Sequence, residues 1–385
     1  AKAGGLESRP RLRCPQKSEE SLARPLAFFR DDGGRIGDRR VAFRRKRRHD
    51  HDCGAGGSSV SGVDDSRSGL ALLDKTHSGA DGFRAGGLHS RSIEVLDQRG
   101  IAVRFLSQGK VAQGVGFHMI PLDISDSPTR HNYLLGLTQN HIERLLAGWV
   151  GELAVPIYRG RDVTGFAQDG AGVDVALSDG QSLRAAYLVG CDGGRSLIRK
   201  AANIEFPGWD PTTSWLIAEV EMTEEPKWGF HQDALGFHGI GKVENSGLVR
   251  IVLTESHLRL DSEPSLRDVS EALVVVYGTD YGIHSPPWIP RFTDVTRQAA
   301  AYRDRRVLLA GDAAHVHPPV GGQGLNIGVQ DAVNLGWKLA QVVKQTSPEV
   351  SWIRTTPSVT RLLRACCAAR WRRPRFADRT TVPRP

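Results

Sequence analysis

Residues 306–328 of the 385-residue chain read RVLLAGDAAHVHPPVGGQGLNIG. The hydrophobic run 306–310 predicts a short buried strand, and a helix is expected from Gly324 onward. We expect the inward face of that helix to carry small and apolar residues at helical spacing. Those residues are Leu325, Gly328, Val329, Ala332, Gly336, Leu339, Ala340 and Val343. The stretch therefore predicts a strand, a glycine-rich turn and a helix.

This order of elements suits a polyol and phosphate site. An aspartate at the carboxyl end of a strand, here Asp312, can accept hydrogen bonds from sugar-like hydroxyl groups. The glycines that follow allow backbone N–H groups at a helix start to approach an anion or an electron-rich ring. The alternative is an ordinary glycine-rich turn before a buried helix. The number of residues that occur here in the expected order counts against that alternative.

The same residues resemble the second FAD signature of the FAD-dependent aromatic hydroxylases, the class A flavoprotein monooxygenases. That signature is G-D-A-A-H-x-x-x-P-x-x-G-Q-G-x-N, and the chain matches every fixed position. The resemblance implies that Asp312 binds the ribityl O3′ of FAD and that backbone 321–326 meets the pyrimidine edge of the isoalloxazine. It also implies that the Pro319 loop lies beside the substrate. The implied cofactor-binding residues of this stretch are Gly311, Asp312, Pro319, Gly322, Gln323, Gly324, Leu325 and Asn326.

A second strand, glycine turn and helix is predicted over 188–199. Ser196 is placed to cap the helix, and a capped connection without a ligand is the alternative reading. The order resembles the D-G-x-x-S-x-x-R element of the same family, which contacts both FAD and the NAD(P)H path. The resemblance therefore adds Asp192 and Arg199 to the candidate cofactor-binding residues.

Two weaker matches occur earlier in the chain. Residues 84–91 resemble the flavin-contacting R-x-x-G-L-H-x-R stretch and make Arg84 a candidate, and 139–146 resemble a Q-x-x-x-E-R-L-L helix and make Gln139 one. The region 84–100 is similar to rifampicin and polyketide monooxygenases, so rifamycin-type substrates and antibiotic modification are implied by resemblance alone. In total the resemblance covers about residues 71–346.

Turn chemistry and periodicity predict the remaining organisation. We expect a strand at 70–74, a helix at 92–100 and a β-meander at 163–189 with Asp-Gly turns. Strands at 215–220, 234–243 and 248–254 predict an antiparallel substrate-domain sheet. The expected fold class is α/β in the mixed α+β sense, a Rossmann-like FAD-binding domain of the glutathione-reductase type with that sheet inserted. The expected segments are 1–52 unassigned and basic, 53–205 FAD-binding, 206–297 substrate-binding, 298–346 FAD-binding, and 347–385 an unassigned basic tail.

The amino-terminal part departs from the family pattern. A dinucleotide fold opens with a strand and G-x-G-x-x-G, followed by an acid that holds the adenosine ribose. Asp74 supplies the acid, but the glycines at 54–57 are followed by Ser59 where a third glycine is expected. The alternative hypothesis is therefore a truncated or frame-shifted, catalytically defective relative that does not retain FAD. Both tails would then be out-of-frame readings.

Composition limits the other functions. The net charge of +8 resides in the tails, since residues 1–52 hold 15 Lys and Arg against 8 Asp and Glu and residues 347–385 hold 9 against 2. Nucleic-acid binding is not expected, because the basic run at 44–48 lacks interleaved aromatics. No apolar stretch long enough for a membrane span and no secretory leader occur, so we expect a cytoplasmic protein.

Metal and disulfide chemistry are not expected either. We interpret His315 and His317 as polar loop residues without a proton-transfer role, and a His-x-His pair alone is a poor metal site. The five cysteines lack metal or redox spacing. They are Cys14, Cys53, Cys191, Cys366 and Cys367.

The predicted activity is FAD-dependent monooxygenation of a small aromatic or polyketide molecule with NAD(P)H and O2. We name no catalytic side chain, because in such enzymes the flavin carries the chemistry and the protein supplies position and exclusion of water. An oxidase or a halogenase is an alternative within flavoproteins. Trp288-Ile289-Pro290 is only a fragment of the halogenase W-x-W-x-I-P signature.

Overall fold

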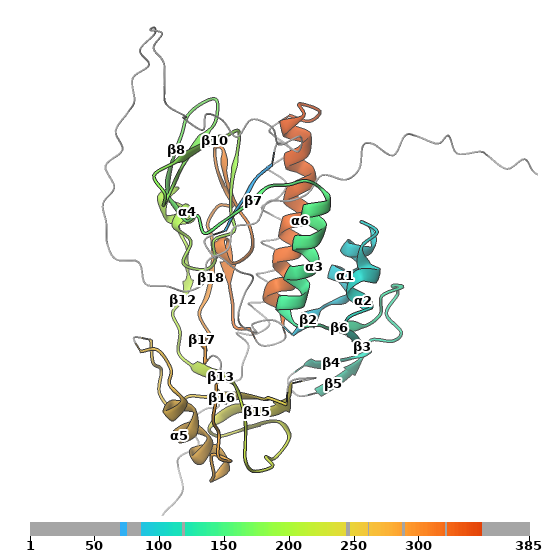
Figure 1. Cartoon of the computed structure of the whole chain (residues 1–385), viewed down its shortest axis with the longest axis vertical. Helices are drawn as coiled ribbons and strands as arrows, with labels where there is room; N and C mark the ends of the chain where they lie inside the picture. The colour runs from blue at the N-terminus through green and yellow to red at the C-terminus, as the bar shows by residue number, and fades with distance from the viewer. Residues whose placement is uncertain are drawn as a thin grey trace, which may run out of the picture.

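The computed structural model describes residues 70–74, 86–117, 120–243, 247–260, 262–286, 289–319 and 322–348 (Figure 1). The expectations for 1–69, for Arg84 and for the chain after 348 lie outside the described residues. Within the described part, helices and sheets form a mixed fold, which agrees with the expected class. No helix of that part is long and apolar enough to cross a membrane.

A pair of parallel strands forms the centre of the first core. Its elements are β11 (Leu188–Gly190), β19 (Arg303–Asp304), β20 (Val307–Leu309), α4 (Leu197–Ala201) and α6 (Gln323–Val343). β11 lies parallel to β20, whose other edge pairs with β19. Both central strands are buried on both faces, which explains their uninterrupted apolar sequences. α6 packs on one face through Leu335 and Val342, and α4 packs on the other through Ile198.

A second parallel pair lies nearby. β1 (Leu72–Asp74) pairs with β7 (Ile157–Arg159), and Leu72 and Leu73 are buried. The predicted strand at 70–74 is therefore confirmed in a shorter form. The predicted strand at 306–310 is likewise confirmed as β20.

The meander is shorter than predicted. Its strands are β8 (Val163–Gln168), β9 (Val173–Leu177) and β10 (Ser182–Ala185), paired antiparallel in the order β10-β9-β8. The prediction that the meander runs to 189 is wrong, because residues 188–190 form β11 and pair parallel with β20. The chain leaves one sheet and enters another within the two residues between β10 and β11.

The next group of elements surrounds the first turns of α6. It consists of β2 (Gly87–Leu88), α1 (Ser90–Asp97), α2 (Ala102–Leu106), β3 (Lys110–Ala112), β4 (Gly114–Phe117), β5 (Ile120–Asp123), β6 (Leu134–Gly136) and α3 (Gln139–Glu152). The helix expected at 92–100 is confirmed as α1, displaced by two residues at its start. Ile93, Phe105 and Ile142 form a core against which Leu325 of α6 packs.

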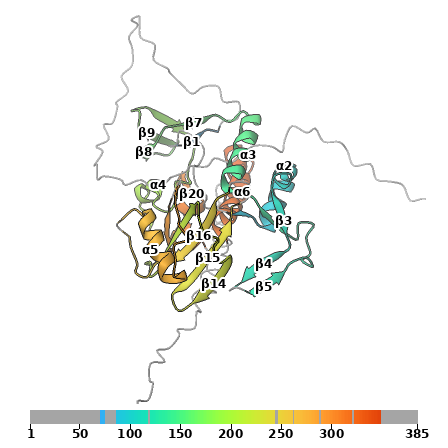
Figure 2. The ribbon, with the colours of Figure 1, turned by 60° about the horizontal axis from the view of Figure 1, so that its bottom comes forward.

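An antiparallel sheet forms the other large core (Figure 2). Its elements are β13 (Ser214–Val220), β14 (Gly229–Asp233), β15 (Gly236–Lys242), β16 (Val249–Thr254), β17 (Arg291–Thr293) and α5 (Leu266–Tyr277). The strand order is β14-β15-β16-β13-β17, which confirms the predicted antiparallel sheet. α5 covers one face through Val269 and Leu273, and Figures 1 and 2 both show it on the outer side of the sheet.

A small three-stranded sheet connects the two cores. It consists of β12 (Gly208–Trp209), β18 (Thr296–Gln298) and β21 (His315–Val316) in the order β12-β18-β21. β21 follows directly on the short 3₁₀ helix η2 (Gly311–Ala313). The predicted glycine turn is therefore held at both ends by strands.

The buried face of α6 differs from the predicted one. Val343 was expected to face inward, but it is 55% exposed. The buried side instead includes three polar residues, Asn326, Asp331 and Lys338. The prediction was wrong because it selected only apolar residues. Asn326 and Asp331 of this helix are buried because they form hydrogen bonds with the backbone of other segments.

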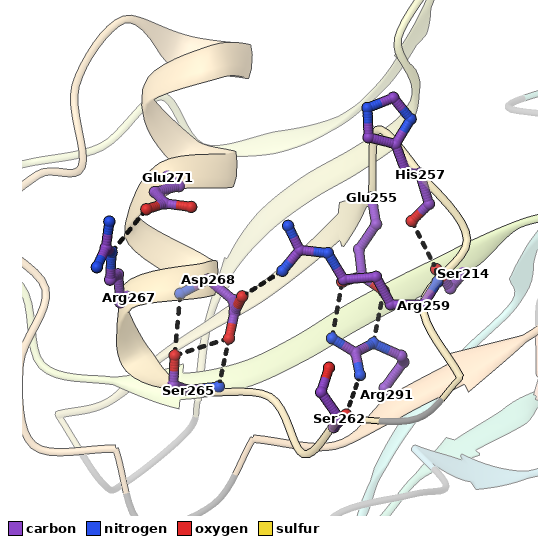
Figure 3. Close-up of polar contacts among 10 residues, drawn as sticks. All are labelled: Ser214, Glu255, His257, Arg259, Ser262, Ser265, Arg267, Asp268, Glu271 and Arg291. Carbon is purple, nitrogen blue, oxygen red and sulfur yellow. Dashed lines mark hydrogen bonds and ion pairs between the residues drawn. The ribbon is translucent and has the colours of Figure 1, made fainter.

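A buried ion pair fastens the end of the antiparallel sheet (Figure 3). Arg291 on β17 donates to both carboxylate oxygens of Glu255, with Nε 2.6 Å and Nη2 2.9 Å from them. The two side chains are only 8% and 6% exposed. Arg291 also donates to the carbonyl of Ser262. This pair therefore fixes the loop that leads to α5.

We predict that Glu255→Gln lowers the free energy of unfolding by about 3–5 kcal/mol, because it leaves the Arg291 cation buried without its counter-charge. The measurement is urea unfolding followed by tryptophan fluorescence. The exposed pair Arg267–Glu271 on α5 serves as control, and Arg267→Ala should cost only about 0.3–0.5 kcal/mol. Equal losses for the two variants would contradict the assignment.

Candidate functional site

The start of α6 presents open backbone. Gly322 precedes the helix with φ +62°, a left-handed conformation that favours glycine, and its N–H donates to the carbonyl of Pro319 at 2.9 Å. No side chain caps the helix, and a Cβ built on Gly324 would meet nothing within 4 Å. The first N–H groups of a helix lack partners within it. This end of α6 can therefore receive hydrogen-bond acceptors of a ligand.

Asn326 joins this helix start to a distant segment. Its Oδ1 accepts from the backbone N–H of His89 at 2.8 Å, and its Nδ2 donates to the carbonyls of Gly87 and Gly322 at 3.2 and 2.9 Å. The residue is 1% exposed. Its side chain is therefore committed to the protein, while the Gly322 turn and the β2 segment are held beside each other.

The Gly311–Ala313 turn lies against the same helix. Gly311 has φ +61°, and a Cβ built on Gly328 of α6 would lie 3.7 Å from the Gly311 Cα. Within this turn Asp312 is exposed, whereas Ala313 is buried. The turn thus directs a carboxylate outward while its own backbone rests on α6.

His315 is not the polar loop residue that we predicted. It lies in β21, is 2% exposed, and its Nε2 is 2.6 Å from Oδ2 of Asp331 on α6. The prediction was wrong because β21 pairs with β18 and thereby encloses the ring. Asp331 itself was missed, although it lies three residues after Gly328 and four before Leu335, a spacing that places all three on one helical face.

Arg199 holds the turn from its other side. The guanidinium donates to the carbonyls of Ala313 and Gly194 at 2.8 and 2.9 Å and lies 3.7 Å above the ring of Phe206. Burial lowers the pKa of Arg199, which nevertheless stays cationic because guanidinium groups do not lose their proton in proteins. Its donors thus stabilise the backbone on which Asp312 is carried.

Asp192 stabilises the neighbouring turn in the same way. Its carboxylate accepts from Ser196 Oγ at 2.5 Å and from the N–H of Ile198 at 3.0 Å. Ser196 in turn accepts from the N–H of Arg199 at 2.9 Å and is the N-cap of α4, as expected. Asp192 therefore stabilises the connection between β11 and α4.

Two other predicted site residues make contacts of their own. Gln139 begins α3 and donates to Glu143 at 2.7 Å. Asp74 ends β1, and its Oδ2 is 2.8 Å from Nη1 of Arg159. Arg84 lies outside the described residues. Of the expected ADP-binding elements, the described part of the chain contains only Asp74.

The residues at the α6 end fit the flavin and ribityl part of FAD. An exposed aspartate on a turn that packs against α6, together with a helix start that no described side chain caps, matches a ligand that carries hydroxyls next to an acceptor-rich ring. The open space at Gly324 leaves room for a flat ring to approach the backbone. Among the described residues, no group of three or more His, Cys, Asp or Glu side chains could hold a metal ion. The site therefore suits binding and orientation of a redox cofactor.

Comparison with known proteins agrees with this geometry. The family described as FAD binding domain matches residues 60–351. The chain is 44% identical over 292 residues to a rifampicin monooxygenase of Streptomyces venezuelae, covering 73% of this chain and 60% of that protein. It is 40% identical over 307 residues to a rifampicin monooxygenase of Rhodococcus hoagii, covering 76% and 62%. The chain thus spans about three fifths of the length of these curated relatives.

Solved structures are similar as well. The anhydrotetracycline hydroxylase OxyS from Streptomyces rimosus superposes with a TM-score of 0.67 at 40% identity, covering 72% of this chain and 58% of that one. The Diels-Alderase PyrE3 of pyrroindomycin biosynthesis gives 0.72 at 31% identity, covering 78% and 67%. The two proteins are named for different reactions and have similar folds.

We predict that Asn326→Asp destabilises the chain by about 1–3 kcal/mol, because an oxygen replaces the amide donor that faces the carbonyls of Gly87 and Gly322. Side-chain volume is preserved, so packing is not the cause. Thermal unfolding measures the loss. Gln330→Ala is the control, because it removes a single side-chain bond, from Gln330 Nε2 to the backbone carbonyl of Asn326 one turn before it. A larger effect from the control would contradict the role of Asn326.

Proposed function

We propose, from the premise that this chain belongs to the FAD binding domain family, that it is an NAD(P)H-dependent monooxygenase of aromatic or polyketide molecules. The observation that carries the proposal is a set of hydrogen bonds made by α6: Asn326 binds the backbone of Gly87, His89 and Gly322, and Asp331 binds the N–H of Gly311. One helix therefore holds two other parts of the sequence, and one of them carries the exposed residue Asp312. The monooxygenase names of several relatives support the reaction class.

Each residue has a proposed part in cofactor binding. Asp312 accepts hydrogen bonds from ribityl hydroxyls, and the backbone N–H groups of 322–324 meet the flavin ring edge. Asp192 and Arg199 act by holding the backbone of their turns, because both carboxylate oxygens of Asp192 and both Nη atoms of Arg199 are hydrogen-bonded within the protein. Asp74 contributes to the adenosine end. Arg84, Gln139, Gly311, Gln323, Leu325 and Asn326 complete the set.

When bound, FAD would supply the redox chemistry, in which electrons from NAD(P)H reduce O2, one oxygen atom enters the substrate ring and the other leaves as water. The chain's own part is to bind, orient and exclude water. Pro319 is exposed three residues before Gly322, the N-cap of α6, and would border the space in which a substrate lies beside the flavin. No described side chain is assigned a proton-transfer step.

The antiparallel sheet offers an aromatic face for such a substrate. Its face opposite α5 carries Trp215 stacked on Phe292, with ring centroids 5.3 Å apart, and Phe230 stacked on Phe237 at 5.7 Å. Phe230 lies over Gly239, where a Cβ would meet its ring at 1.9 Å, and is 50% exposed. Flat aromatic rings stack favourably on one another. This face supports a planar aromatic substrate.

The same proposal extends to the domains. Segments 53–205 and 298–346 would form a Rossmann-like FAD-binding domain of the glutathione-reductase type, with 206–297 as the inserted substrate domain. The separate cores on α6 and on α5 support that division. The proposed location is the cytoplasm, with no nucleic-acid or membrane partner. The comparisons do not favour the alternative of a defective relative.

Cofactor titration tests the binding part of the proposal. We expect the purified chain to quench flavin fluorescence and to bind FAD more tightly than FMN, which lacks the adenosine. Asp312→Ala should weaken the binding of both ligands by roughly ten- to hundredfold, since one hydrogen bond to a charged group contributes about 1.5–3 kcal/mol. Asp74→Ala should weaken FAD while leaving FMN unchanged. Equal FAD and FMN affinities would contradict recognition of the adenosine end.

Turnover is tested on the FAD-loaded chain. NADPH oxidation should rise on addition of a phenolic or polyketide aromatic, with a product heavier by one oxygen atom. FAD binding without substrate-stimulated NADPH loss would refute monooxygenation while retaining the cofactor assignment. A chain that binds no flavin would refute both.

A further inference from the structure

Asp331 is a buried acidic residue on the face of α6 that packs against the Gly311–Ala313 turn. Its side chain is 4% exposed. Oδ2 accepts from the backbone N–H of Gly311 at 2.9 Å and lies 2.6 Å from Nε2 of His315. Among the described residues, Oδ1 has no hydrogen-bond partner. Oδ2 of Asp331 therefore contacts nitrogen atoms of two residues, one before and one after Asp312 in the sequence.

Packing alone does not explain an acid at this position. A buried carboxylate loses hydration, and that loss is offset only where donors replace the water. Ala332 and Leu335 supply the apolar contacts of this part of α6. The two donors that reach Asp331 belong to the residue before Asp312 and to the third residue after it. The acid is thus placed where it acts on that turn.

The turn needs such a fastening because its backbone is unusual. Gly311 is held in the left-handed region, and a Cβ built on it would lie 3.9 Å from the Cα of Gly328 on α6. Arg199 fixes the far end through the carbonyl of Ala313. Asp331 is the matching contact at the near end. Between these two anchors, the direction of the exposed Asp312 carboxylate is set.

We propose that Asp331 is a positioning residue for cofactor binding, acting through the Gly311–Ala313 turn to hold Asp312 toward the ligand. This inference rests on the proposed function, since it assumes that Asp312 binds a flavin. Asp331 does not touch the ligand, because its carboxylate is enclosed by Gly311, His315 and α6. Its effect on affinity therefore depends on the presence of the Asp312 side chain.

A double-mutant cycle on the full chain tests this dependence. The dissociation constant for FAD is measured by flavin fluorescence for wild type, Asp331→Asn, Asp312→Ala and the double variant. The asparagine keeps an acceptor for Gly311 but removes the charge and weakens the contact with His315. We expect Asp331→Asn to weaken FAD binding roughly tenfold in wild type, and less than twofold in the Asp312→Ala background. Additive losses would overturn the proposal.

A matched control separates positioning from general stability. Asp268→Asn makes the same substitution in the capping box of α5, where Asp268 binds Ser265 and Arg259 far from the turn (Figure 3). It should lower the melting temperature without changing the dissociation constant for FAD. A parallel loss of affinity in this variant would show that the effect of Asp331→Asn reflects stability, and would overturn the proposal.

A ligand-free measurement keeps the two proposals distinguishable. Hydrogen–deuterium exchange of peptides covering 307–316 should be faster in Asp331→Asn than in wild type without any FAD present, because the Gly311 N–H loses its charged acceptor. Unchanged exchange would overturn the positioning role. A wild-type chain that binds no flavin but shows the faster exchange would overturn the proposed function, and with it the ligand part of this inference, while leaving the contact established.

Discussion

The structure depends on polar groups buried along α6 that hydrogen-bond to the backbone of other segments. Asn326 bonds to residues 87 and 89, more than two hundred residues earlier in the sequence, and Asp331 bonds to residue 311, twenty residues earlier. One helix therefore fixes the positions of two other segments. Such bonds have strict geometry, and an unpaired buried group costs about 1–3 kcal/mol. The arrangement therefore favours a single position for each turn.

This organisation separates support from binding. The side chain of Asn326, Oδ2 of Asp331 and the two Nη atoms of Arg199 are hydrogen-bonded within the protein, whereas Asp312 and Gly322 are exposed. The antiparallel sheet with α5 has its own core and its own buried ion pair between Glu255 and Arg291. Ligand chemistry would thus take place at a surface whose supporting contacts are already formed without it.

Local sequence signals predicted much of this fold. The Asp-Gly turn of the meander, the apolar run of β20 and the Ser196 cap each depend on neighbouring residues, and each was predicted correctly. The glycine spacing after residue 311 predicted a polyol and phosphate site, and that site stays a prediction. The family resemblance then gave the site its cofactor, and the family match agrees with it.

Features that depend on distant contacts were not predictable in the same way. β11 and the meander strands look alike in sequence, and only the partner strand β20 distinguishes them. Strand β14 and helix α5 were not predicted, although α5 carries a capping box at Ser265 that signals its start. The burial of Asp331 has no local sequence signal beyond its helical spacing, because the donor that compensates its lost hydration belongs to another segment.

The central claim is that segments around 87–89, 311–316 and 322–328 form one flavin-binding joint on α6. Hydrogen–deuterium exchange of the full chain with and without FAD tests it most directly. We expect peptides from all three segments to gain protection together on addition of FAD, while peptides of α5 stay unchanged. Protection confined to one segment, or spread equally into α5, would contradict the account.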